Sequence, residues 1–316
     1  MAWLAVAMDV TQEAVDWVRT SVAGTAYTGP MHLVVWEAEG EDSAAAAPWA
    51  YTLRLYVPDD GTGQRLLAAI AAQLHPLQRT RLISELAITD CAELPPPDAP
   101  PTSQVIGDRL VLVPPGATES AEANQLTIQL DHSLAFGSGF HPATRLSLQL
   151  LDRYVQPGMQ TLDLGCGSGI LSVALAKLGA TVLALDNDPI AVAATQAMAT
   201  QNDVADSITA QVGSLGQGST LGHWLGEELT AIATIPATAT FDLIVANILA
   251  RVHITLAADY GAALRLVTPP MPQLITAGFT TDYEADVVAA LGAAGFAVAD
   301  RVMDGEWVAL ACQRKI

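Results

Sequence analysis

The chain has 316 residues, which is long enough for one large domain and a smaller one, each with a buried core. Hydrophobic residues make up 51% of it, yet alanine inflates this value, and no run of about 18 apolar residues, as a membrane span requires, occurs. The net charge of −19 disfavours direct binding to nucleic-acid phosphate and would attract a basic protein partner.

The amino terminus predicts a cytoplasmic protein, because Met1–Asp9 has no basic region and meets a charge too early for a secretory signal. The three cysteines, Cys91, Cys166 and Cys312, show no CxxC or Cys–His spacing, so neither a disulfide framework nor a metal site is predicted. Cys166 lies within a glycine-rich turn and is interpreted as a small turn-filling residue rather than as a nucleophile.

Residues 1–92 are predicted to form a small α+β domain of the ferredoxin-like type. Their apolar patterns predict, in order, a strand over 3–10, a helix capped by Thr11, strands over 32–36 and 50–57, a helix over 64–74 and a strand over 83–89. This βαββαβ order is that of a ferredoxin-like domain. Small sheets of this kind are common recognition modules, although the fold alone proves no function.

A proline-rich segment separates this domain from the rest of the chain. The run at 95–101 cannot be helical and predicts a stiff linker, which we place at 93–104. Two short strands are expected next, over 104–113 and 126–131, and the remainder, 105–316, is predicted to be a doubly wound α/β domain. Within it, the stretch rich in Gly, Ser and Thr from 213 to 240 is interpreted as an insertion with little regular structure.

The segment Thr161–Gly169 predicts a cofactor site, because an apolar strand enters a glycine-rich turn that opens directly into a helix. The spacing is G-x-G-x-G, whereas a dinucleotide site has G-x-G-x-x-G, so a nicotinamide-dependent oxidoreductase is disfavoured. Asp163 at the strand end suits a ligand with an ammonium group and a sulfonium better than a pyrophosphate. Asp186 ends the next strand about 20 residues on, where a carboxylate accepts from ribose hydroxyls. Asp163 could instead cap a helix or hold the loop.

Two further segments bear on the chemistry. The loop Leu134–Arg145 brings together Phe136, His141 and Thr144 and could close over a cofactor, or could simply connect domains. The strand Phe241–Leu249 carries Asn247 at its carboxyl end, which the topology places beside the glycine turn. An Asn oxygen there can accept from an amine N–H and aim the nitrogen lone pair at a methyl donor. Alternatively, Asn247 caps the following helix.

Together, the loop at 136–144, the turn at 163–169, Asp186 with Asp188 and the strand at 245–249 resemble the ribosomal protein L11 methyltransferase (PrmA) family. The resemblance covers about residues 107–312. It implies a Rossmann-like class I methyltransferase domain, S-adenosylmethionine as cofactor, and methylation of lysine side chains and the N-terminal amine of ribosomal protein L11. It also implies that Asn247 is the catalytic residue near the acceptor amine. The residues expected to bind the cofactor are Phe136, Thr144, Asp163, Gly165, Gly167, Asp186 and Asn247.

The sequence departs from the family pattern at Ser138 and Ala143, each in place of a Thr, and in the linker, where prolines replace a charged, Trp-rich segment. Because family members hold their substrate with the N-terminal domain, two alternatives remain: a protein-lysine methyltransferase with another substrate, or a non-catalytic S-adenosylmethionine-binding module. Ile248 and Leu249 stand where amide and nucleobase methyltransferases carry prolines, which argues against such acceptors. We expect a monomer with a basic ribosomal protein as partner and no direct contact with nucleic acid or membrane.

Overall fold

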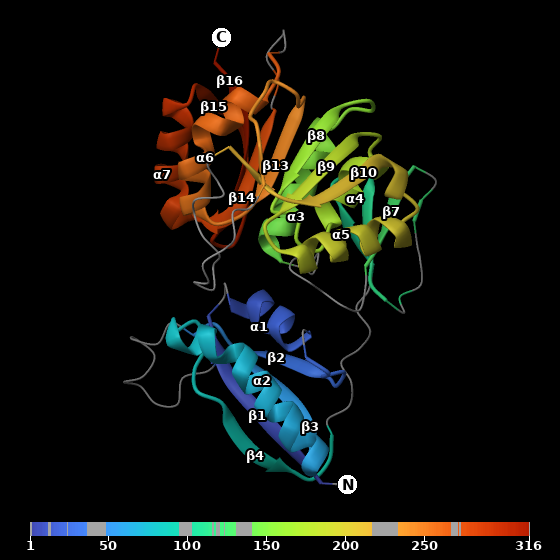
Figure 1. Ribbon diagram of the computed structural model, residues 1–316, viewed down its shortest axis with the longest axis vertical. Helices are drawn as coiled ribbons and strands as arrows, with labels where there is room; N and C mark the ends of the chain where they lie inside the picture. Colours follow the sequence, from blue (N-terminus) through green and yellow to red (C-terminus); the bar gives the residue numbers. More distant parts are fainter. Residues whose placement is uncertain are drawn as a thin grey trace. The chain divides into compact units, whose positions relative to one another are not determined.

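The chain divides into two units, Met1–Pro100 and Pro101–Ile316, here called the N-terminal and C-terminal units (Figure 1). The computed structural model describes residues 2–11, 14–23, 25–36, 49–94, 103–115, 117, 121–122, 124–130, 141–216, 233–266, 271 and 273–315. The proline run predicted to form a stiff linker, 95–101, lies outside the described residues.

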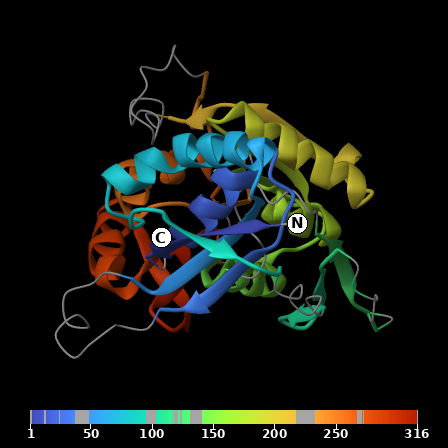
Figure 2. The ribbon, with the colours of Figure 1, turned by 90° about the horizontal axis from the view of Figure 1, so that it is seen from below.

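The N-terminal unit has the predicted βαββαβ order. Its elements are β1 (Trp3–Val10), α1 (Ala14–Ala23), β2 (Met31–Val35), β3 (Tyr51–Pro58), α2 (Gly61–Arg79) and β4 (Ala87–Cys91). The strands form an antiparallel sheet in the order β2-β3-β1-β4. Alternate residues of β1, such as Val6, Met8 and Val10, are buried together with apolar residues of both helices, so α1 and α2 cover one face of the sheet (Figure 2).

Two boundaries in this unit differ most from prediction. The second helix was expected to stop at residue 74, before Pro76, but α2 continues to Arg79 with Pro76 inside it. Leu74 and Leu77 are both buried, and burial of Leu77 offsets the hydrogen bond that the proline removes. The fourth strand begins at Ala87 rather than at Ile83, which forms only an isolated bridge with Val10.

A mixed seven-stranded sheet forms the centre of the C-terminal unit, in the order β10-β9-β8-β13-β14-β16-β15. The strands from β10 to β14 are parallel, whereas β16 and β15 are antiparallel to their neighbours. Strand order reverses between β8 and β13, and ligands bind at such a switch point, beyond the carboxyl ends of the strands. The strands are β8 (Gln160–Leu164), β9 (Thr181–Asp186), β10 (Ile208–Val212), β13 (Leu243–Asn247), β14 (Leu274–Thr280), β15 (Phe296–Asp304) and β16 (Trp307–Arg314).

Helices cover both faces of this sheet, as expected of a doubly wound fold. One buried core joins the sheet to α3, α4 and α5, and a second joins its other face to α6 and α7 (Figure 1). Their bounds are α3 (Pro142–Tyr154), α4 (Ile170–Lys177), α5 (Pro189–Gln201), α6 (Ala250–Ala263) and α7 (Thr281–Ala293), with a short 3₁₀ helix at Ala205–Ser207. None of the helices in the described segments is long and apolar enough to span a membrane.

Smaller strands flank the main sheet. The segment expected to be one strand over 104–113 is a hairpin of β5 (Gln104–Ile106) and β6 (Leu110–Val113), because Gly107 turns the chain with a φ of 63°. Strand β6 pairs in parallel with β7 (Leu126–Gln129). The predicted insertion at 213–240 lies largely outside the described residues, but its ends carry the paired strands β11 (Ser214–Leu215) and β12 (Thr234–Ile235).

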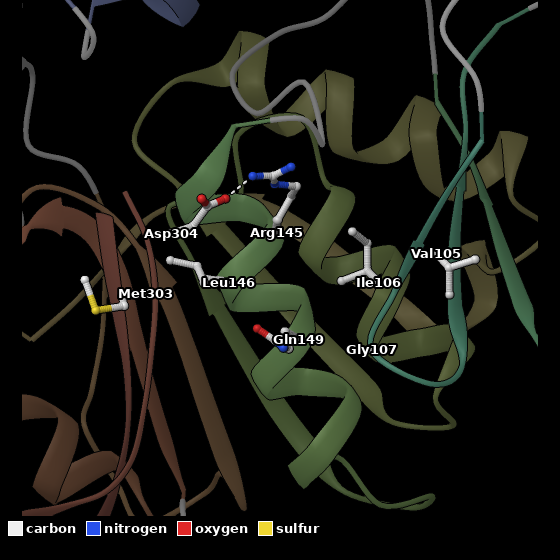
Figure 3. Close-up of a pocket in the computed structure, with 8 residues that line it drawn as sticks. All are labelled: Val105, Ile106, Gly107, Arg145, Leu146, Gln149, Met303 and Asp304. Atoms are coloured by element: carbon white, nitrogen blue, oxygen red, sulfur yellow. Dashed lines mark hydrogen bonds and ion pairs between the residues drawn. The ribbon is translucent and has the colours of Figure 1, made fainter. Parts of the chain in front are cut away.

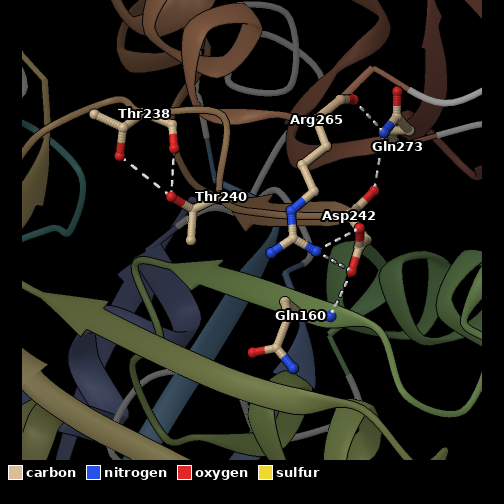
Figure 4. Close-up of polar contacts among 6 residues, drawn as sticks. All are labelled: Gln160, Thr238, Thr240, Asp242, Arg265 and Gln273. Carbon is tan, nitrogen blue, oxygen red and sulfur yellow. Dashed lines mark hydrogen bonds and ion pairs between the residues drawn. The ribbon is translucent and has the colours of Figure 1, made fainter.

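A polar cluster joins the amino ends of β8, β13 and β14 (Figure 4). The carboxylate of Asp242 accepts from the Gln160 backbone N–H at 2.8 Å and from Arg265 Nη1 at 3.0 and 3.2 Å. Gln273 Nε2 donates to the carbonyl oxygens of Asp242 and Arg265 at 3.2 and 2.9 Å. These bonds hold the amino ends of the three strands in place relative to one another. The predicted site residues lie at the opposite edge of the sheet, at the carboxyl ends of the strands.

Candidate functional site

The glycine turn after β8 has the backbone that the sequence predicts. Gly165, Gly167 and Gly169 have φ values of 76°, 51° and 83°, a region that residues with a Cβ rarely adopt. The N–H of Gly165 donates to the carbonyl of Leu185 at 2.8 Å, which ties the turn to the end of β9. A Cβ at Gly165 would lie 2.5 Å from Ile248 Cγ2. The turn and the segment after β13 are therefore in contact, as expected at the switch point.

Asp163 is fully buried in β8 and has one engaged and one free oxygen. Its Oδ2 accepts from Ser172 Oγ in α4 at 2.6 Å, whereas Oδ1 has no hydrogen-bond partner among the described residues. Burial raises the pKa of Asp163 to about 7, opposed by the Ser172 hydrogen bond and assisted by the charge of Asp186. Asp163 thus anchors its strand to α4, and a cation or a donor at Oδ1 would lower the desolvation cost of this carboxylate.

Asp186 ends β9 and holds the glycine turn. Its Oδ2 accepts from the N–H of Gly167 and its Oδ1 from the N–H of Asp188, both at 3.0 Å. Burial raises the pKa of Asp186, and the backbone hydrogen bonds oppose this. A carboxylate offers about four lone-pair positions, so the side chain can still accept from a ligand hydroxyl while it holds the turn.

Asn247 and Thr144, which lie far apart in the sequence, meet in the structure. Asn247 Nδ2 donates to Thr144 Oγ1 at 3.3 Å. Thr144 is 1% exposed, whereas Asn247 is half-buried. The alternative that Asn247 caps the next helix is wrong, because the N-cap of α6 is Leu249. Since the amide nitrogen faces Thr144, the Asn247 oxygen is left to accept from another donor.

Sequence reasoning placed His141 in a loop that could close over a cofactor, and the structure shows it as the N-cap of α3. Its Nδ1 accepts from the N–H of Ala143 at 3.1 Å, and its ring stands edge-on to Trp307 with centroids 4.4 Å apart. The Trp307 indole N–H is buried, and no hydrogen-bond partner for it occurs in the described segments. A polar residue directly before Pro142 is a signal for a helix start that could have identified this cap. Phe136, the remaining predicted site residue, lies outside the described residues.

Cys166 is buried within the turn and accepts a hydrogen bond from Thr195 Oγ1 at 3.2 Å. Burial and the nearby charges of Asp163 and Asp186 raise the pKa of its thiol, which leaves it unreactive at neutral pH. In the described parts of the chain, no three His, Cys, Asp or Glu side chains gather as a metal site would require.

A separate cavity of about 320 Å³ opens between the β5–β6 turn, α3 and β15 (Figure 3). Arg145 and Asp304, both in its lining, form an ion pair that joins α3 to β15. Val105 and Met303 in its wall are more than half exposed, at 56% and 52%. The predicted site residues are not among its lining residues, so this hollow is distinct from the glycine turn and Asn247.

Comparisons with known proteins place the chain in one family. Residues 98–315 match the family model described as ribosomal protein L11 methyltransferase (PrmA). Proteins of that name from Chloroflexus aurantiacus and Herpetosiphon aurantiacus are 39% and 36% identical; the matches cover 99% and 100% of this chain and 98% and 100% of theirs. The crystal structure of a ribosomal protein L11 methylase from Lactobacillus delbrueckii subsp. bulgaricus is 28% identical with a TM-score of 0.54, covering 68% of this chain and all of that one (100%). The chain therefore belongs to the ribosomal protein L11 methyltransferase (PrmA) family.

Proposed function

We propose that this chain transfers methyl groups from S-adenosylmethionine to amino groups of ribosomal protein L11, namely lysine side chains and the N-terminal amine. The observation that carries this proposal is the extent of the match. Relatives named ribosomal protein L11 methyltransferase align with this chain over 98% and 100% of their own lengths. The N-terminal unit is therefore shared as well as the domain with the glycine turn, and we assign to it the recognition of the substrate protein.

We assign each part of the cofactor to a different group of site residues. S-adenosylmethionine supplies an electrophilic methyl group on a sulfonium. We assign the buried Oδ1 of Asp163 to the cationic part of this cofactor, because this carboxylate oxygen has no donor among the described residues. We assign Asp186 to the ribose hydroxyls and the glycine turn to close backbone contact with the cofactor. Phe136 and Thr144 complete the proposed set.

Asn247 is the proposed catalytic residue. An amine attacks a methyl group only through a free lone pair, so the acceptor must be neutral and correctly oriented, and strong acid–base catalysis is not needed. The Asn247 amide nitrogen is engaged by Thr144 at 3.3 Å. In our proposal the remaining amide oxygen accepts an N–H of the substrate amine and aims its lone pair at the methyl group.

The test is transfer itself. The purified chain is incubated with labelled S-adenosylmethionine and with ribosomal protein L11 from cells that lack the enzyme, and the modified residues are mapped by mass spectrometry. We expect label on L11 lysines and on its N-terminal amine. Label on another protein only would establish a methyltransferase with a different substrate. Cofactor binding without transfer to any large-subunit protein would indicate a non-catalytic module.

We also infer that the enzyme works as a monomer in the cytoplasm, on the protein rather than on nucleic acid. The net charge of −19 supports action on the protein rather than on nucleic acid, because such a field repels nucleic-acid phosphate. Light scattering of the purified chain checks the monomer, and a gel-shift assay with ribosomal RNA checks the nucleic-acid claim. A dimer, or RNA binding at moderate salt, would contradict it.

A further inference from the structure

A buried histidine in α6 has both ring nitrogens in hydrogen bonds. His253 is 0% exposed; its Nε2 lies 2.9 Å from the carbonyl oxygen of Ala277 and its Nδ1 lies 3.1 Å from Tyr260 Oη. Tyr260 is also 0% exposed and belongs to the same helix. The ring of Phe279 packs edge-on against the imidazole, with centroids 5.4 Å apart. Imidazole and phenol therefore form a polar chain inside an otherwise apolar core.

The partners determine the tautomer of His253. A carbonyl oxygen can only accept, so Nε2 carries the hydrogen and donates to Ala277. Nδ1 is then an acceptor and receives the hydroxyl hydrogen of Tyr260. Burial lowers the pKa of His253 to about 4, partly opposed by hydrogen bonding to the backbone of Ala277 and Ile248. At neutral pH the ring is therefore uncharged, with Nε2 as the donor to Ala277 and Nδ1 as the acceptor from Tyr260.

The hydrogen bonds that run from Tyr260 through His253 end at Ala277, next to the proposed catalytic residue. Ala277 lies opposite Asn247 in the pairing of β13 with β14, and its carbonyl also accepts from the N–H of Ile248 at 3.0 Å. The following Gly278 leaves no room for a side chain, because a Cβ there would lie 2.5 Å from the carbonyl oxygen of Ile248 and 2.9 Å from Asn247 Oδ1. One carbonyl with two donors thus holds the peptide between Asn247 and Ile248 against β14.

We propose that His253 is a positioning residue that sets the orientation of Asn247 through the Ala277 carbonyl, with Tyr260 fixing the tautomer. This rests on the proposed function, in which the Asn247 oxygen aims the acceptor amine. An apolar side chain at position 253 would fill the same space and would avoid the cost of burying two polar ring nitrogens. It could not, however, donate a hydrogen bond to the backbone beside Asn247, and we infer that this bond is the function of His253. The printed hydrogen bonds of the His253 ring go to Tyr260 and to the Ala277 carbonyl, so in this proposal its effect on turnover passes through the backbone beside Asn247.

The experiment compares His253→Gln with His253→Leu in the full chain. The amide nitrogen of Gln can take the place of Nε2 and donate to Ala277, whereas Leu keeps the volume and loses the donor. We expect His253→Leu to lower kcat about 10-fold to 100-fold with the Kd for S-adenosylmethionine little changed, and His253→Gln to recover most of kcat. Leu256→Val, a buried change in the same helix, is the matched control for lost packing and should leave kcat unchanged.

Two further measurements separate this inference from the proposed function. Hydrogen exchange of the Ile248 amide, in the protein without substrate, should be faster in His253→Leu than in the wild type and restored in His253→Gln. In a double-mutant cycle, His253→Leu should cost no further kcat once Asn247 is replaced by Ala. Unchanged amide exchange, or losses that multiply in the double variant, would overturn the positioning role. An Asn247→Ala variant with wild-type kcat would instead overturn the role proposed for Asn247.

Discussion

At the scale of single residues, Asn247 carries two hydrogen-bonding groups, and Thr144 engages only one of them. Replacing Asn247 with Ala removes the oxygen proposed to aim the amine but touches neither Asp163 nor the glycine turn. We expect kcat to fall about 100-fold, as for a misaligned reacting group, while the Kd for S-adenosylmethionine stays nearly unchanged. Steady-state kinetics and calorimetry measure the two quantities. An equal loss in both would remove the aiming role.

Asp163 makes cofactor binding depend on pH. Its pKa is raised to about 7, so below this value the carboxyl is mostly protonated and a cation binds less favourably. A bound cation lowers that pKa, so binding releases a proton. The Kd for S-adenosylmethionine should therefore fall as pH rises towards 7, by at most about tenfold per pH unit, and level off above it. Calorimetry in buffers of different ionisation enthalpy detects the proton. Asp163→Asn should bind weakly with a flatter profile; a wild-type profile without slope would contradict the assignment.

At the scale of elements, the glycine turn requires both its backbone conformation and its lack of a side chain. Gly158 and Gly165 have similar φ values, 86° and 76°, but a Cβ at Gly158 would meet nothing within 4 Å. Both Gly→Ala variants should lose about 1–2 kcal/mol of unfolding free energy from the strained φ. Only Gly165→Ala should also lose cofactor binding and transfer, because its methyl group would displace Ile248. Chemical denaturation and calorimetry test the pair; equal cofactor binding by both variants would show that the contact with Ile248 does not matter.

Element prediction succeeded where the apolar pattern was local and failed where a distant contact decided the boundary. The βαβ unit around the glycine turn matches, because its strands and its helix are separate contiguous apolar segments, with Gly165 after β8 and Gly179 after α4. Helix α2 runs past Pro76 because Leu77 is buried, which no local rule reveals. The hairpin of β5 and β6 was missed because its turn at Gly107 is held by Asp152 of α3, which accepts from the N–H of Asp108 at 2.7 Å.

At the scale of the whole molecule, the net charge of −19 should strengthen the binding of a basic substrate protein through long-range attraction. We expect the KM for ribosomal protein L11 to rise several-fold when salt increases from about 50 to about 300 mM, because the Debye length shortens. The kcat and the Kd for S-adenosylmethionine should change much less, since those contacts are short-range and mostly buried. A KM independent of salt would mean that the acidic composition has no part in substrate binding.

The sequence by itself determined the family, the two-part organisation and the glycine turn, because these depend on contiguous patterns of apolar residues, glycines and carboxylates. The tertiary structure decided which of those residues meet. Thr144 and Asn247 are 103 positions apart, yet they share a hydrogen bond. Asp163 Oδ2 accepts from Ser172, whereas its Oδ1 has no partner in the described part of the chain. His253 gave no signal in the sequence, since a histidine in an apolar helix acquires a role only through the carbonyl that faces it. Hydrogen bonds between such distant residues depend on how strands and helices pack against one another, and no single segment of the sequence determines that packing.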